Sequence, residues 1–174
     1  MKKEAVEKDK NELKDTVVSI KRISKTVKGG RTMRFSALVV VGDGTGSIGV
    51  GHGKSAETPE AIRKGKEQAM RNIVKINLDN NISVPHDYVG IWGTSRVLLK
   101  RSKEGTGVIA GGPVRSVMEM AGIQNIRTKS LGSRNKNNVA LATINGLMNM
   151  KSPSEIATLR GKDVKDILAG IVKK

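Results

Sequence analysis

Between residues 21 and 34 the chain carries six basic side chains and no acidic one. They are Lys21, Arg22, Lys25, Lys28, Arg31 and Arg34, with Ser24 and Val27 among them and Gly29 and Gly30 near the centre. Ammonium and guanidinium groups neutralise phosphates, whereas a surface that needs only solubility mixes its charges. Glycines let a loop bring its backbone close to a groove while basic side chains reach the phosphates. The stretch therefore predicts a loop that binds a nucleic-acid backbone.

Two glycine patterns resemble nucleotide-binding motifs but lack the context that those motifs need. Residues 44–49 satisfy G-x-G-x-x-G, yet the chain continues as a strand, whereas a dinucleotide site needs a helix start at this point. Gly53-Lys54-Ser55 resembles the end of a P-loop, but Ile48 stands where that motif needs a glycine. The sequence therefore favours neither a bound nucleotide cofactor nor nucleotide hydrolysis.

Groups that usually carry catalysis or bind metals are sparse. His52 and His86 are the only histidines, no acidic cluster accompanies either, and the chain has no cysteine. Disulfides and thiolate zinc sites are thereby excluded, and a catalytic triad or metal site is not favoured. We expect a protein that is not an enzyme and that holds neither metal nor cofactor.

A second glycine-rich stretch precedes Pro113. It contains Gly105, Gly107, Gly111 and Gly112. Such a loop before a helix can present free backbone N–H groups to an anion or to a partner protein. A simple tight turn is the alternative, which we favour less because a turn seldom needs four glycines.

The elements that position the basic loop follow from the pattern around it. Residues 16–27 alternate as a strand, and residues 33–41 and 47–55 predict its antiparallel neighbours. A helix would follow, with Thr58 as its N-cap and Pro59 at its first position. Its expected core stripe is Ile62, Ala69, Met70, Ile73 and Val74. Its basic residues are expected to form a solvated face rather than a binding surface.

Glycines at positions 49, 51 and 53 share one face of the third strand. Two interpretations stay open: another backbone, of protein or RNA, lies against this face, or the helix behind the sheet packs there. On the first interpretation, Gly51, Gly53 and the neighbouring Lys54 belong to the RNA-binding surface.

The second half of the chain again mixes strands and helices. Helices are predicted from Pro113, over 137–150 and from Ser152, where Glu155 has capping-box spacing. The chain is thus predicted to be α+β, with an N-terminal β-β-β-α unit and a C-terminal β-β-α-β-α unit. The expected boundaries are a mobile tail at 1–12, an N-terminal domain at 13–78, a linker at 79–85, a C-terminal domain at 86–160 and a basic tail at 161–174.

Composition narrows the class of partner. The 174 residues carry a net charge of +16, which favours a polyanion. A membrane is the weaker choice, because no apolar run approaches the roughly 18 residues of a spanning helix. Only Phe35, Tyr88 and Trp92 are aromatic, too few for a surface that stacks unpaired bases. The remaining way to recognise a nucleic acid is through its sugar-phosphate backbone and its shape.

Five stretches occur in the order and at the spacing of one known family: SKTVKGGRTMRFSALVVVGDGTGSIGVGHGKS, TPEAIRKG, EGTGVIAGGPVRSVMEMAGI, TKSLGSRN and ATINGL. With them the chain resembles the bacterial-type small-subunit ribosomal protein five family. The resemblance implies an N-terminal domain like the double-stranded-RNA-binding fold, and a structural, non-enzymatic role on small-subunit rRNA in the cytoplasmic ribosome.

The resemblance also implies particular contacts. Ser24, Lys25, Val27, Lys28, Gly29, Gly30 and Arg31 would reach rRNA, and Gly105, Gly107 and Arg115 would lie near protein four of the small subunit. Protein eight is a further implied partner, mRNA passes nearby at the entry channel, and one copy is expected per ribosome, with an influence on decoding accuracy. A nucleotide hydrolase and a general RNA chaperone outside the ribosome are the alternative classes.

Overall fold

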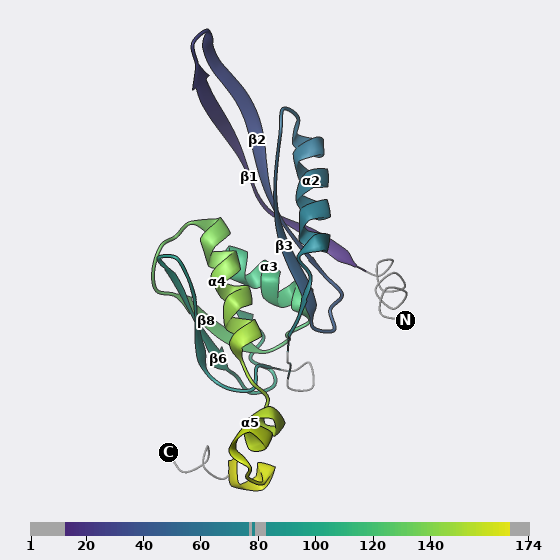
Figure 1. The fold of residues 1–174 in the computed structure, drawn as a ribbon, viewed down its shortest axis with the longest axis vertical. Helices are drawn as coiled ribbons and strands as arrows, with labels where there is room; N and C mark the ends of the chain where they lie inside the picture. The colour runs from purple at the N-terminus through teal and green to yellow at the C-terminus, as the bar shows by residue number, and fades with distance from the viewer. Residues whose placement is uncertain (1–12, 77, 79–82, 168–174) are drawn as a thin grey trace.

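The computed structural model describes residues 13–76, 78 and 83–167. The predicted tail at 1–12 lies outside these residues, as do positions 79–82 of the predicted linker and positions 168–174 of the predicted C-terminal tail. The described chain contains two four-stranded sheets with helices, and the predicted α+β class is confirmed (Figure 1).

The N-terminal sheet is antiparallel throughout, with strand order β1-β2-β3-β4. Its elements are β1 (Lys14–Val27), β2 (Gly30–Gly42), β3 (Ser47–Ser55), α2 (Thr58–Arg71) and β4 (Val74–Lys75). Alternate residues of β2 face opposite sides of the sheet, and both sides are buried over the second half of the strand. Ala37, Val39 and Val41 pack toward α2, whereas Leu38 and Val40 pack toward the C-terminal unit.

The turn between β2 and β3 is fixed by one carboxylate. Asp43 accepts hydrogen bonds through Oδ1 from the backbone N–H groups of Thr45, at 2.7 Å, and Ser47, at 2.9 Å. Gly44 and Gly46 have φ values of 72° and 107°, which residues with a Cβ rarely adopt. Burial alone would raise the pKa of Asp43, but the hydrogen bonds from Thr45 and Ser47 outweigh it and lower the pKa to about 2.

This depressed pKa predicts an acid-dependent loss of stability. Because the folded-state pKa lies below the usual 3.8, the Asp43 carboxylate stabilises the fold above that value and loses its contribution as the pH falls toward 2. With allowance for solvent screening we expect a contribution of about 1 kcal/mol. Thermal unfolding of wild type and Asp43→Asn across this pH window tests it. The stability difference should shrink as the pH falls, and a constant difference would contradict the assignment.

Helix α2 covers the glycine face of β3. A Cβ built on Gly49, Gly51 or Gly53 would lie 2.2, 2.0 or 1.9 Å from a backbone oxygen of α2, namely those of Ala69, Gly65 and Ala61. Both Gly51 and Gly53 are buried. Their predicted role in contacting RNA is therefore wrong, because the glycines bring the helix backbone against the strand. The alternative of packing against the helix is confirmed.

The same contact corrects two details predicted for the helix. The buried residues of α2 are Ala61, Gly65 and Ala69. Ile62 and Met70 are only partly buried and pack at the edge of the core between α2 and the sheet. The N-cap is Glu57, without a side-chain cap, and Thr58 is the first helical residue.

The C-terminal sheet has strand order β5-β6-β8-β7, and only the β7–β8 pair is parallel. Its elements are β5 (Tyr88–Trp92), β6 (Ser95–Arg101), β7 (Val108–Ile109), α3 (Gly112–Ala121), β8 (Ile126–Ser130), α4 (Lys136–Asn149) and α5 (Pro153–Arg160). The short strand β7 was not predicted. The capping box of α5 is confirmed, since Ser152 Oγ accepts from the Glu155 N–H and the Glu155 carboxylate accepts from the Ser152 N–H.

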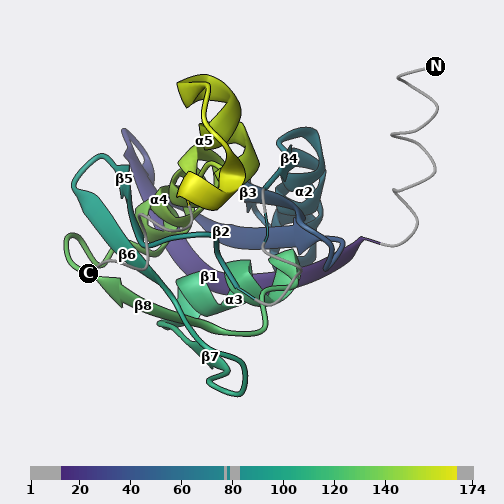
Figure 2. The ribbon, with the colours of Figure 1, turned by 90° about the horizontal axis from the view of Figure 1, so that it is seen from below.

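The two units share one hydrophobic core. Leu38 and Ile48 of the N-terminal sheet belong to the same buried cluster as Met118 of α3 and Leu147 of α4. Helix α3 lies against the N-terminal sheet on the face away from α2 (Figures 1 and 2). The tightest junction is backbone on backbone: the Gly44 N–H donates to the Met120 carbonyl at 3.0 Å.

Candidate nucleic-acid interface

The basic loop is the end of a long β-hairpin. Strand β3 pairs with β2 only from Phe35 onward, so β1 and β2 continue as a two-stranded ribbon beyond the sheet and α2 (Figure 1). Residues 22–34, which form this ribbon and its turn, are exposed except for the half-buried Ile23. The register runs from Arg22 opposite Phe35 to Val27 opposite Gly30.

The register places the basic side chains on two faces. Lys21, Ser36 and Lys54 form one row across β1, β2 and β3, and Arg34 and Lys25 lie on the same face, opposite Ile23 and Thr32 respectively. This face continues into Leu38 and therefore turns toward the C-terminal unit. We call Lys21, Lys25, Arg34 and Lys54 the hairpin basic face.

The remaining predicted loop residues lie around this face. Ser24, Arg22 and Arg31 lie on the opposite side of the ribbon, and Lys28 lies at the turn. A Cβ built on Gly29 or Gly30 would meet no atom within 4 Å, so the turn backbone is open to a ligand. Gly30 has a φ of 136°, which explains a glycine at the end of the turn.

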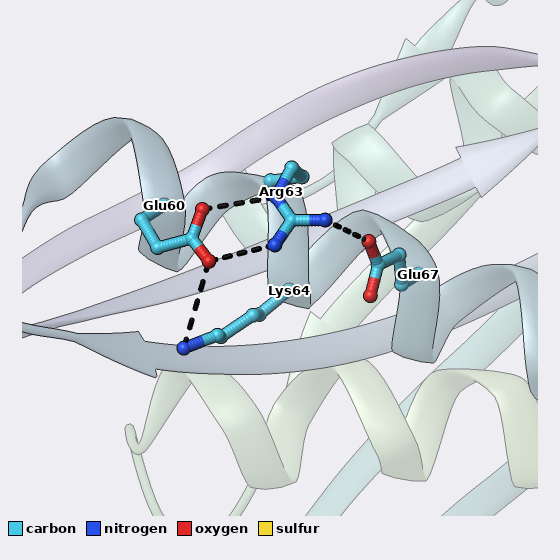
Figure 3. Close-up of polar contacts among 4 residues, drawn as sticks. All are labelled: Glu60, Arg63, Lys64 and Glu67. Carbon is cyan, nitrogen blue, oxygen red and sulfur yellow. Dashed lines mark hydrogen bonds and ion pairs between the residues drawn. The ribbon is translucent and has the colours of Figure 1, made fainter.

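The cations of the hairpin have no acidic partners within the part of the chain that the structure describes. Helix α2 differs: Arg63 pairs with Glu60 at 2.7 Å and with Glu67 at 2.6 Å, and Lys64 lies 3.6 Å from Glu60 (Figure 3). The hydrogen bond from Arg63 lowers the pKa of Glu60 to about 2. Lys66 pairs with Asp15 of β1 at 2.7 Å. The hairpin cations are therefore free to meet phosphates, whereas three of the four basic side chains of α2 are already paired with carboxylates.

The histidine nearest the hairpin is part of the packing. His52 Nε2 lies 2.5 Å from Ser36 Oγ, and burial, followed by the charge of Lys54, lowers the pKa of His52. His86 packs edge-on against the ring of Tyr88. The described residues contain no group of three or more histidines and carboxylates that could hold a metal ion.

The glycine-rich stretch forms a separate surface loop. Gly105 and Gly107 both have positive φ, and a side chain at either position would meet no atom within 4 Å. The Asn125 side chain holds the loop by accepting a hydrogen bond from the Gly107 N–H at 2.9 Å. Arg115, on the exposed side of α3, pairs with Glu119 at 2.8 Å. Asn125 is a buried polar residue that the sequence analysis missed, and no motif marks it.

The aromatic side chains form no stacking surface in the described chain. Phe35 and Tyr88 pack against the two cores, and Trp92 is half-exposed at the end of β5. Within the described ranges no helix is sufficiently long and apolar to span a bilayer.

The hairpin is the feature that indicates the class of protein. A projecting ribbon of unneutralised cations with an open glycine turn defines a protein that binds nucleic acid through its phosphate backbone.

Comparison with protein-family models shows to which family of nucleic-acid-binding proteins the chain belongs. The family model for the N-terminal domain of ribosomal protein S5 matches residues 13–77, and the model for its C-terminal domain matches residues 90–160. The chain belongs to the ribosomal protein S5 family, as the resemblance predicted. It is a ribosomal protein of the small subunit that binds rRNA, and its family is structural rather than enzymatic.

Proposed function

We propose that the chain holds small-subunit rRNA with its hairpin and so helps to fix the head of the subunit against the body. In this role it acts near the decoding and mRNA-entry region and contributes to the accuracy of translation. The observation that carries the proposal is the β1–β2 hairpin, with Lys21 at the base of its two-stranded ribbon and Lys25, Lys28 and Arg34 on the ribbon itself. The ribbon extends beyond the body, and none of these cations has an acidic partner among the described residues.

A ribbon of this shape suits a joint between two RNA segments. Its cations lie on both faces and at the turn, so it can neutralise phosphates that approach from more than one side. The C-terminal unit anchors its base through the shared core, which fixes the direction of the ribbon. Such a charged arm holds RNA segments in place without performing a reaction on them.

We further propose that Gly105, Gly107 and Arg115 contact protein four of the small subunit, and that protein eight is a second neighbour. The open backbone at Gly105 supports a close approach by another chain, and Asn125 holds the loop in one conformation for it. In the cytoplasmic ribosome the protein is present in one copy.

Sedimentation of a native lysate through a sucrose gradient tests the proposed function. We expect the full chain to migrate with the small subunit in a one-to-one ratio and to stay there through a moderate salt wash. Release at higher salt is expected, because phosphate contacts weaken as salt rises. A chain found mainly at the top of the gradient would contradict the proposal and favour a general RNA chaperone.

A further inference from the structure

The C-terminal sheet has one face that no described element covers. Helices α3 and α4 pack on the other side, where Val97, Leu99 and Ile126 are fully buried (Figure 2). Strand alternation turns the intervening residues outward. The open face consists of Val89 and Ile91 on β5, Arg96, Leu98 and Lys100 on β6, Arg127 and Lys129 on β8, and Ile109 on β7.

Apart from the half-buried Leu98 on β6, the open face is basic on its central strands and aliphatic at its edges. Strands β6 and β8 are central in the sheet, and they carry Arg96, Lys100, Arg127 and Lys129. The exposed aliphatic residues of the edge strands are Val89, Ile91 and Ile109. Protein–protein interfaces have the opposite arrangement, with an apolar centre that is depleted of charge inside a polar rim. The arrangement therefore favours a polyanion over a protein as the occupant.

Three of these cations repel one another across the sheet. Lys100 lies directly opposite Arg127, and Lys129 follows two residues later on the same face of β8. Like charges directly opposite destabilise a sheet. Within the described ranges no acid forms an ion pair with any of the three. The carboxylate of Asp87, on a neighbouring segment, accepts a hydrogen bond from the backbone N–H of Arg101 at 2.9 Å.

We propose that this open face is a second rRNA-binding surface, which lies along the phosphate backbone of a base-paired RNA segment. The inference rests on the proposed function and extends it to the other sheet. The face has no aromatic residue, so it does not stack unpaired bases, and a helical backbone is the form of RNA that it suits. A bound phosphate backbone would also relieve the repulsion between Lys100, Arg127 and Lys129.

The test compares full-length variants on protein-free small-subunit rRNA. The open-face variant replaces Lys100, Arg127 and Lys129 by glutamine. The α2 control variant makes the same change at Lys64 and Arg71 of α2 and at Lys75 of the adjoining strand β4, which removes an equal charge from another surface. We expect the open-face variant to bind the rRNA roughly 10- to 100-fold more weakly at physiological salt. The salt slope, which is the dependence of the logarithm of the binding constant on the logarithm of the salt concentration, should fall in magnitude by about 2 to 3. The control should change both quantities by much less.

The melting temperature separates binding from folding. Because the open-face variant removes repulsion between like charges, it should melt at or above the temperature of the unmodified chain. An open-face variant that keeps the affinity and salt slope of the unmodified chain overturns the inference but leaves the proposed function intact. An unmodified chain without salt-dependent rRNA binding overturns both. Normal rRNA binding with failure to join the assembled subunit would assign the face to a protein partner and also overturn the inference.

A tethered cleavage reagent provides an independent measurement. The chain has no cysteine, so Leu98→Cys introduces a single thiol at the centre of the open face, and Glu67→Cys introduces one on α2. With an iron chelate on the thiol, we expect Leu98→Cys to cleave both strands of one base-paired rRNA segment. Cleavage no stronger than that from the Glu67→Cys control would contradict the proposed surface.

Discussion

Replacing Lys21, Lys25 and Arg34 by glutamine is expected to weaken binding to small-subunit rRNA by about 100-fold at physiological salt. These three cations share the hairpin basic face and have no acidic partner within the described chain, so their charge is available to phosphates. Each phosphate contact contributes roughly 0.7 to 0.9 to the dependence of binding on salt, so the slope should fall by about 2 to 3. Binding constants across a salt series give both values.

The α2 control variant again shows whether the effect depends on position or only on net charge. Since the hairpin ribbon is exposed, the Lys21, Lys25 and Arg34 variant should keep the melting temperature of the unmodified chain. Equal losses of affinity in the hairpin and α2 variants would show that total charge, rather than the ribbon, governs binding. An unchanged salt slope in the hairpin variant would exclude these phosphate contacts.

The second large effect is on stability, and it concerns the strand under α2. Gly51→Ala should lower the free energy of unfolding by about 3 kcal/mol or more, because overpacking a close backbone contact displaces the helix. The new Cβ would lie 2.0 Å from the Gly65 carbonyl oxygen and 2.4 Å from the Ala69 nitrogen. For a chain of this size the melting temperature should fall by roughly 10 °C.

Gly29→Ala is the matched control for this substitution. Position 29 has open space around the added Cβ and lies at the exposed turn of the hairpin. Replacing a glycine where the backbone allows it does not destabilise the fold and reduces the entropy of the unfolded chain. Calorimetry of both variants should therefore show a large loss for Gly51→Ala alone. Equal melting temperatures would mean that α2 does not lie against the glycine face.

The hairpin could be predicted because local signals agree along it. Alternation from Thr16 to Val27, glycines at the turn and the apolar run from Ala37 to Val41 all indicate antiparallel strands. The C-terminal helices could be predicted for the same reason: the helices expected from Pro113, over 137–150 and from Ser152 correspond to α3, α4 and α5. Segments with several turns or a full alternation carry their own signal.

The contacts between elements were less predictable. A hydrophobic pattern marks which residues are buried, but Ala61 and Gly65 have little or no side chain and therefore do not stand out as the core stripe of α2. Two-residue strands such as β7 are too short for any periodicity. The unbroken apolar run of β2 indicates that both its faces are buried, yet it does not show that α2 and α3 are the helices that cover them.

The same limits apply to the candidate site. The sequence indicated where cations gather, but only the pairing register assigns Lys21, Lys25 and Arg34 to one face and Arg22 to the other. Gly51 and Gly53 were misassigned because a bare strand face looks the same whether a helix or an RNA lies on it. The open face of the C-terminal sheet needed the order of four strands, which are far apart in the sequence.

The core that joins the two sheets has a consequence for synthesis of the chain. The N-terminal sheet and α2 are complete at Lys75, but Leu38 and Ile48 are covered only by helices that end as late as Asn149. At the usual rate of translation, roughly 4 to 15 s separate the synthesis of Lys75 from that of Asn149. During that interval the nascent sheet presents an apolar surface to the solvent. Its final shape is therefore reached after translation of α4, and a chain terminated before it would be a substrate for chaperones and proteases.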